Sequence, residues 1–395
     1  MMMMIKRRKF CRYIALSSAC LAGALEQKLA LSTTANFSLT KSFHNWVVLY
    51  WMPYDNDLVR FGEPIIKMLT RGTQNSEVAV VVQSDYWGDK KMRRRLLLKG
   101  TTKEINIQGE DSSDVSAFSA YLDWAKKNFE AENWAIIIVG HGGRINEVSP
   151  DDHGATNQTR TWMRVDKLTN VLSNFNQGVN GRVELLFWQN CNKATLEVMY
   201  EARNCAKYTL ASQLLLGAPN YYYEGFLNRL QEPSVGGREA AIAIMDSERA
   251  DMYHTLTLVD NEEVKLIPDK LSRLLQLILN NNLLSVRQSE LSIFPYFGEQ
   301  CCDALVFLGY LSSLSKKGYL EFTEFTNFLR QKVITFHKIG GELYGVSPRD
   351  NTNLERLCGL SLYLPETQKD TSRYSSLALY QKVDLVNLYR RIVKI

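Results

Sequence analysis

The chain has 395 residues, of which 45% are apolar and 23% are charged. These fractions are ordinary for globular proteins and exclude a collagen-like, coiled-coil or largely disordered chain. The net charge is +5, and the whole excess lies in the first 24 residues, where five lysines and arginines precede the first acid, Glu26. Because the remainder is neutral, the sequence argues against nucleic-acid binding, which needs a clustered basic surface.

The first 24 residues have the layout of a secretory signal peptide. A basic stretch, Lys6–Lys9, precedes an apolar stretch from Tyr13 to Leu21 and the small residues Ala22-Gly23-Ala24. An alternative cleavage point follows Ala35. The apolar stretch is too short to span a bilayer, which takes about 20 residues. We therefore expect an exported protein, periplasmic or extracellular, with no stable membrane span. The alternative is a disordered tail or a misassigned start codon.

Strand and helix patterns alternate after this leader. Continuous apolar runs predict buried strands at 46–51, 78–83, 134–139, 183–188 and 208–211. Apolar residues three and four positions apart predict helices at 57–70, 114–129, 164–176 and 192–206. The alternation predicts an α/β fold, an αβα sandwich with a mostly parallel sheet and helices on both faces. The basic run 90–95 is interpreted as a solvated turn that enters a strand.

The second part of the chain has a different pattern. Residues 217–237 are rich in glycine, proline and tyrosine and predict a long loop. Helical patterns follow at 264–284, 302–314 and 321–336, and a last strand is expected at 360–364. We therefore divide the chain into a leader at 1–24, an αβα core at 45–261 and a helical C-terminal region at 262–395 that packs on the core.

Five cysteines follow the leader, at positions 191, 205, 301, 302 and 358. An odd number in an exported chain leaves at least one thiol unpaired, so a reactive cysteine is worth seeking. No CxxC pair occurs, and no histidine stands at zinc-ligand spacing from another ligand. We therefore expect no structural zinc.

Two residues at strand ends can carry chemistry. His141 follows the strand 134–139 and is flanked by glycines, and Cys191 follows the strand 183–188 where a helix is expected to begin. Open α/β sheets bind ligands at the carboxyl ends of their strands. A helix N-terminus favours a thiolate, and a neighbouring imidazole can exchange its proton. The alternative is a buried small side chain and an ordinary turn histidine.

Eight short segments carry a family likeness through their order and spacing: Trp46–Tyr50, Asp55–Leu58, His141–Gly143, Cys191–Glu197, Ala211–Ser212, Leu258–Asp260, Cys302–Leu305 and Gly359–Pro365. Over residues 45–365 the chain thereby resembles the clostripain-like cysteine peptidases, relatives of caspases, legumains and gingipains. The resemblance implies a caspase-like fold and an endopeptidase acting on proteins or peptides. It implies that Cys191 is the nucleophile and that His141 protonates the leaving amine. It also implies an oxyanion hole formed by the backbone N–H groups of Gly142 and Cys191.

The sequence departs from the family two residues before the nucleophile. Clostripain-like enzymes usually have an aspartate there that helps to bind a basic P1 side chain, whereas this chain has Gln189. After Ser212 the family often has an acid, and this chain has Gln213. A neutral amide cannot neutralise a buried arginine. We therefore expect Gln189, Ser212 and Gln213 to form a neutral S1 pocket that favours an uncharged P1 residue.

Other acidic residues receive structural interpretations. We expect Asp55 and Asp57 to cap the helix 57–70 by accepting its first N–H groups. Because some family members use calcium, Asp151 and Asp152 are candidate cation ligands, and otherwise we expect no cofactor or metal. The alternative to an enzyme is a catalytically inactive relative that keeps the fold as an interaction protein. The sequence leaves the natural substrate and the oligomeric state open.

Overall fold

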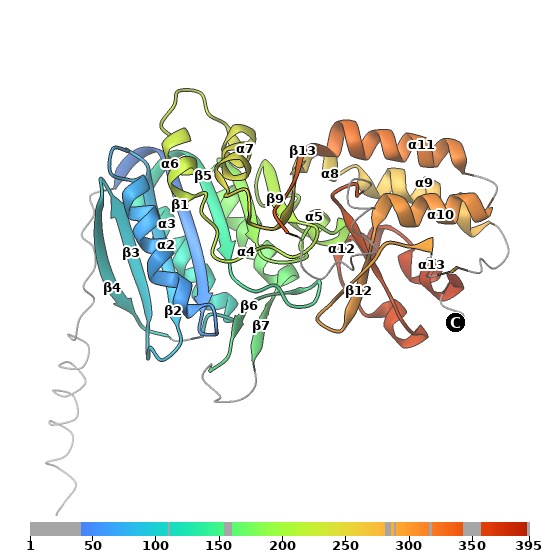
Figure 1. Ribbon diagram of the computed structural model, residues 1–395, viewed down its shortest axis with the longest axis horizontal. Coiled ribbons are helices and arrows are strands. Elements are labelled where there is room, and N and C mark those ends of the chain that lie inside the picture. The colour runs from blue at the N-terminus through green and yellow to red at the C-terminus, as the bar shows by residue number, and fades with distance from the viewer. Residues whose placement is uncertain are drawn as a thin grey trace, which may run out of the picture. The chain divides into compact units, whose positions relative to one another are not determined.

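The five strands predicted between residues 46 and 211 assemble into one central sheet (Figure 1). The computed structural model describes residues 41–109, 111–153, 160–280, 286–287, 290–315, 318–342 and 357–392. The sheet has nine strands in the order β13-β10-β9-β8-β5-β1-β2-β3-β4. Neighbours among β9, β8, β5, β1 and β2 are parallel, and the pairs β2–β3, β3–β4, β9–β10 and β10–β13 are antiparallel. The mostly parallel sheet is thereby confirmed.

The strands are β1 (Ser42–Tyr54), β2 (Ala79–Tyr86), β3 (Met92–Leu98), β4 (Thr101–Ile107), β5 (Phe129–Val139), β6 (Glu147–Asp151), β7 (Thr161–Arg164), β8 (Val183–Gln189), β9 (Tyr208–Ser212), β10 (His254–Asp260), β11 (Ile293–Tyr296), β12 (Glu299–Asp303), β13 (Ile334–Gly340) and β14 (Ser361–Leu364). The helices are α2 (Val59–Gly72), α3 (Val115–Asn128), α4 (Val165–Gly178), α5 (Leu196–Ala202), α6 (Tyr223–Arg229), α7 (Gly237–Ser247), α8 (Asn261–Val264), α9 (Ile267–Leu279), α10 (Ala304–Ser315), α11 (Tyr319–Phe328), α12 (Ala378–Lys382) and α13 (Leu385–Ile392), with a π-helix at Leu329–Val333 and a 3-10 helix at Gln368–Ser372.

Helices cover both faces of the sheet, as the continuous apolar runs predict. Consecutive strand residues point to opposite faces. In β1, the ring of Tyr50 lies 6.1 Å from that of Tyr223 on one face, and the ring of Trp51 lies 5.2 Å from that of Phe118 on the other. Helices α2, α6 and α7 pack side by side, and so do α3, α4 and α5. Two apolar layers therefore hold the sheet between them.

The parallel strands bring separate parts of the sequence to one edge. β5 lies between β1 and β8, and Val139 at its end pairs with Gln189 at the end of β8. Because the carboxyl ends of parallel strands meet at the same edge, the residues after β1, β5 and β8 gather there. The two strands that precede His141 and Cys191 are therefore neighbours in the sheet.

Two local expectations need correction. The run 90–95 does enter a strand, β3, but it is not a solvated turn throughout, because β3 buries Arg95, which pairs with Glu63 and Glu104. These partners compensate the buried charge. The segment 217–237 is not a plain loop, because it contains α6, whose Tyr223 and other aromatic and aliphatic side chains are buried in the core.

The region after residue 262 contains the expected helices and additional strands. The last expected strand is confirmed as β14, which joins β11 and β12 in a three-stranded sheet, while β13 joins the central sheet beside β10. Lys41–Ile395 form one compact unit, and the boundary near 262 stays a prediction. The expected leader at 1–24 lies outside the described residues. None of the described helices is long and apolar enough to cross a membrane.

Candidate active site

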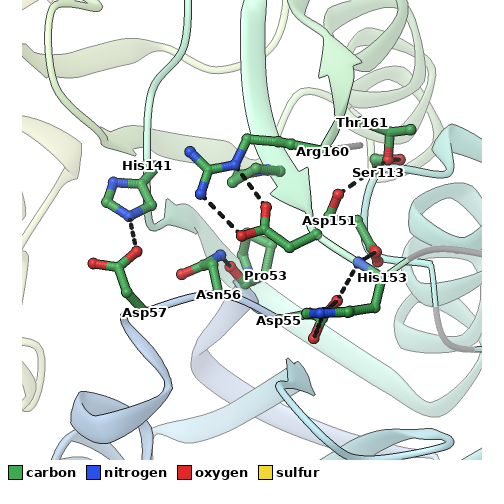
Figure 2. Close-up of polar contacts among 12 residues, drawn as sticks. Pro53, Asp55, Asn56, Asp57, Ser113, His141, Asp151, His153, Arg160 and Thr161 are labelled. Atoms are coloured by element: carbon green, nitrogen blue, oxygen red, sulfur yellow. Dashed lines mark hydrogen bonds and ion pairs between the residues drawn. The ribbon is translucent and has the colours of Figure 1, made fainter. Parts of the chain in front are cut away.

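His141 leaves the carboxyl end of β5, and an aspartate holds its ring. Nε2 of His141 lies 2.8 Å from Oδ1 of Asp57, in the loop between β1 and α2 (Figure 2). Partial burial works to raise the pKa of Asp57, but the hydrogen bond with His141 and the attraction of its charge outweigh burial and lower that pKa. An imidazole that donates from Nε2 to a carboxylate keeps the lone pair of Nδ1 for proton transfer.

The expectation that Asp55 and Asp57 cap α2 is wrong. The helix begins after Leu58, whose N–H donates to Oδ1 of Asn56 at 3.0 Å. Asp55 instead accepts the backbone N–H of His153 at 2.8 Å and contacts its ring at 3.0 Å. Figure 2 shows the side chains of this short polar run directed to different partners. The run thus supplies one ring partner for His141 and one for His153.

Cys191 lies in the turn between β8 and α5, at the pocket edge of the sheet. Its Sγ accepts the N–H of Leu216 at 3.4 Å. Burial raises the pKa of this thiol, against the opposing effects of Leu216, the Tyr296 hydroxyl and the Lys193 charge. The expected helix N-terminus at the thiol is wrong, because α5 begins at Leu196.

The other four cysteines of the described chain are also free, but they are buried, whereas Cys191 is partly exposed. An unpaired thiol is thus present, and Cys191 lies in a pocket wall.

His141 and Cys191 line the same pocket, which has a volume of about 210 Å³. Its walls come from the ends of β1, β5 and β8, from the first turn of α2 and from residues 216–220. None of the residues that line it is an aspartate or glutamate, and Arg60 of α2 is the one permanently charged residue among them. The sequence patterns did not single out Arg60, because a solvated helix surface carries many arginines.

Gln189 also lines this pocket, and both polar atoms of its amide are hydrogen-bonded. Its Nε2 donates to Oδ1 of Asn220 at 2.7 Å and to the hydroxyl of Tyr223 at 2.9 Å, and its Oε1 accepts from Tyr222 at 2.6 Å. The buried aromatic residues that begin α6 therefore fix the pocket floor.

Ser212 and Gln213, the other two expected S1 residues, lie behind the pocket. Both are buried, and neither is among the residues that line it. The hydroxyl of Ser212 contacts Thr255, and the amide of Gln213 donates to Oδ2 of Asp303 at 2.9 Å. The position of Ser212 and Gln213 at a strand end did not reveal where their side chains point. Their contacts are with β10 and with the C-terminal region.

The loop after β5 is held at six consecutive backbone carbonyls, from Gly140 to Ile145. Nδ2 of Asn190 donates to Gly140 at 2.8 Å and to His141 at 3.3 Å. The hydroxyl of Tyr296, at the end of β11, donates to Gly142. Nζ of Lys193 donates to the last three carbonyls at 3.1, 2.6 and 3.3 Å. Sequence reasoning missed these three side chains because their contacts cross between loops.

Gly142 is required where the loops of His141 and Cys191 touch. A Cβ at this position would lie 2.5 Å from the carbonyl oxygen of Cys191 and 2.9 Å from Cε of Lys193. Any side chain would therefore separate the two loops.

Asp151 and Asp152 do not fit a calcium site. Asp152 makes two hydrogen bonds to Arg160, of 2.6 and 2.9 Å, and Asp151 is buried and accepts the N–H groups of Ser112 and His153. No group of three or more histidine, cysteine or acidic side chains in the described parts of the chain is arranged to hold a metal ion. We derive no step through a cation.

A mostly parallel αβα sheet with a thiol and an imidazole at neighbouring strand ends defines a cysteine peptidase of the caspase-like class. The chain belongs to the clostripain family, whose family model matches residues 50–388. It is therefore a cysteine-type peptidase. No curated protein matches the sequence.

Solved structures show the same fold at low identity. A secreted C11 cysteine protease from Bacteroides thetaiotaomicron, solved with an irreversible peptide inhibitor, is 15% identical, with a TM-score of 0.65 over 86% of this chain and 99% of that one. An inactive zymogen C11 protease from Parabacteroides distasonis is 16% identical, with a TM-score of 0.65 over 87% and 99%. Another solved structure of a secreted C11 cysteine protease from B. thetaiotaomicron, named iotapain, is 13% identical, with a TM-score of 0.61 over 86% of this chain and 99% of that one.

Proposed function

We propose that this peptidase is an exported endopeptidase in which Cys191 is the nucleophile and His141 moves the proton. The observation that carries the proposal is that both side chains line one pocket at the carboxyl edge of the sheet, with Asp57 on the ring of His141. A nucleophile, its base and a third group that orients the base are the parts that covalent acyl transfer needs.

The reaction has two halves. In the first, Nδ1 of His141 takes the thiol proton while Sγ of Cys191 attacks the peptide carbonyl carbon, and a C–S bond forms. The oxyanion accepts hydrogen bonds from the backbone N–H groups of Gly142 and Cys191. The C–N bond then breaks, and His141 gives its proton to the leaving amine. In the second half, water attacks the thioester with His141 as base, which releases the acid and restores the thiol.

The environment of the thiol supports a specific role for His141 in the proposal. Because burial raises the pKa of Cys191, the resting thiol keeps its proton at neutral pH. The proton must therefore leave as the substrate is attacked, and the acceptor must be oriented in advance. Asp57 supplies that orientation and stabilises the imidazolium that forms.

The proposed S1 pocket has no acidic side chain and excludes basic side chains. Gln189 presents an amide whose atoms are already bonded, and no lining residue is acidic. The guanidinium of Arg60 in the same wall repels a lysine or arginine. We therefore propose an uncharged P1 residue, with Gln189 as the contact that the pocket offers.

Export is supported by the leader pattern in the first 24 residues. Two of the similar solved structures are of secreted C11 proteases from B. thetaiotaomicron. Its proposed substrate is thus a protein or peptide in the periplasm or outside the cell.

A fluorogenic peptide library that varies only P1 tests the proposal. The purified protein and its Cys191→Ala variant are compared at neutral pH. We expect hydrolysis that requires Cys191 and that is at least about tenfold faster for neutral than for arginyl or lysyl peptides. Faster cleavage after arginine would overturn the neutral pocket. A folded protein that cleaves no peptide would overturn the enzyme and favour an interaction protein.

A further inference from the structure

We infer that Lys193 is a positioning residue that ties the loop of His141 to the loop of Cys191 and thereby sets the geometry of the proposed dyad. The inference rests on the proposed function, because it concerns how the two reacting side chains are held. Lys193 touches neither the substrate pocket nor the ring of His141, and it acts through the backbone between them.

Lys193 is a charged side chain at a fully buried position. It has no solvent exposure, and its three ammonium N–H groups meet three carbonyl oxygens, those of Gly143, Arg144 and Ile145. None of the ion pairs found in the described structure involves it. Burying an ammonium group without a carboxylate partner is costly, and an apolar residue would fill the same space at lower cost. A residue of this kind is expected where function needs it.

The backbone of Lys193 is anchored on the rigid side of the site. Its N–H donates to the carbonyl of Ser212 at the end of β9, at 3.0 Å, and its carbonyl accepts from Thr195 at 2.9 Å. The side chain crosses from this anchor to the loop after β5. Cε packs against Gly142, the residue that follows His141. The nearest carbonyl that the ammonium group holds, that of Gly143, lies two residues after His141 in the chain.

Lys193 complements the contact that Asn190 makes. Asn190 holds the carbonyls of Gly140 and His141, at the start of the loop. Lys193 holds the three carbonyls beyond Gly142. Since the two side chains flank Cys191 in sequence, the nucleophile loop holds the histidine loop on both sides of His141.

The protonation state of Lys193 gives a way to distinguish a positioning role from a purely structural one. Burial lowers the pKa of Lys193 to about 8, although Cys191 on its own loop, Glu147 of β6, and Glu299 and Cys301 of β12 favour the charged form. A neutral amine has two N–H groups and cannot serve three carbonyls. Activity should therefore fall as the pH rises through about 8. The free energy of unfolding should instead rise between about pH 8 and pH 10.5. In this range the folded protein has lost the Lys193 proton, whereas the unfolded chain keeps it up to about pH 10.5.

The test compares Lys193→Met with Lys338→Met, a matched control. Nζ of Lys338 also donates to a backbone carbonyl, that of Met245 at 2.9 Å, but it lies on β13. For Lys193→Met we expect kcat to fall at least about 30-fold with little change in KM, and the alkaline decline near pH 8 to disappear. Lys193→Arg, which keeps the charge and several donors, should recover part of kcat. The control should behave as the wild type.

A second measurement does not depend on activity. In a Cys191→Ala background, Lys193→Met should speed amide hydrogen exchange in residues 140–145 at least about tenfold, while Lys338→Met should not. If Lys193→Met does not fold, wild-type exchange at pH 7 and pH 9, corrected for the intrinsic pH effect, replaces it. We expect less protection of this loop at pH 9.

The outcomes separate the two proposals. A folded Lys193→Met with wild-type kcat, alkaline decline and loop exchange overturns the inference and leaves the peptidase proposal intact. A wild type without Cys191-dependent hydrolysis overturns the peptidase proposal, and hydrogen exchange then decides the inference alone. Equal loop protection at pH 7 and pH 9 also counts against Lys193.

Discussion

Nε2 of His141 lies 2.8 Å from Oδ1 of Asp57, and this contact joins the loops after β5 and β1 at the carboxyl edge of the sheet. Asp57 is largely exposed, with 62% of its side chain accessible. Solvent therefore weakens the electrostatic part of the contact, while its effect on the orientation of the ring remains.

Replacing Asp57 by asparagine should lower kcat by about 10- to 100-fold with little change in KM. The amide can donate a hydrogen bond to the ring, so it no longer enforces the tautomer that keeps Nδ1 free. Asp55→Asn is the control, because Asp55 contacts the ring of His153 in the same short run. Steady-state kinetics on one neutral peptide measures both, and equal effects of the two substitutions would argue against an orienting role for Asp57.

The isosteric change Gln189→Glu should shift specificity toward basic P1 residues. It places a carboxylate in the pocket at the position of an amide that Tyr222 and Tyr223 already contact. We expect the ratio of kcat/KM for arginyl over neutral peptides to rise at least about tenfold. Combination with Arg60→Ala should raise the ratio further, since the repelling charge is removed. An unchanged ratio would mean that Gln189 does not contact P1.

Tyr296→Phe should make Cys191 a slower nucleophile. The hydroxyl of Tyr296 donates to the carbonyl of Gly142 and helps to lower the pKa of the thiol against the dominant effect of burial. At pH 7 we expect the rate of Cys191 alkylation by iodoacetamide to fall about threefold to tenfold. Tyr389→Phe is the matched control, because Tyr389 is buried and donates to the carbonyl of Tyr363. Equal alkylation rates in both variants would contradict this role.

Asp85→Asn should stabilise the protein above acidic pH. Asp85 is buried, its Oδ2 has no hydrogen-bond partner among the described residues, and burial together with Asp151 and Asp55 raises its pKa to about 9. The folded protein thus binds a proton that the unfolded chain loses near pH 4, so stability falls as the pH rises from about 4 to about 9. At pH 8 the variant should gain about 1–3 kcal/mol in the free energy of unfolding. Urea unfolding at pH 5 and pH 8 measures the change, and a variant as pH-dependent as the wild type would refute it.

The parts of the fold that depend on local pattern could be predicted from the sequence. Continuous apolar runs such as 46–51 and 134–139 identify strands that are buried on both faces, and β1 and β5 lie there. The adjacency of β5 and β8 follows from connection rules, so the common pocket of His141 and Cys191 could be anticipated. The buried Arg95 and the helix α6 could not, because their burial depends on partners far away in the sequence.

The supporting residues of the site were hidden for a similar reason. An aspartate after a strand and before a helix is a typical cap, and nothing local distinguishes the Asp57 that contacts His141 from such a cap. Lys193 and Tyr296 act across loops, and their partners are backbone carbonyls, which carry no sequence signal. Ser212 lies at a strand end, but its hydroxyl contacts Thr255 of β10 instead of the pocket.

Covalent labelling tests the central claim most directly. The protein is treated with a peptidyl acyloxymethyl ketone that carries a neutral P1 residue, and the adduct is located by mass spectrometry. We predict one adduct per chain, on Cys191, absent in Cys191→Ala and at least about 100-fold slower in His141→Ala. Labelling that persists in Cys191→Ala, or that is equally fast without the imidazole, would contradict the account.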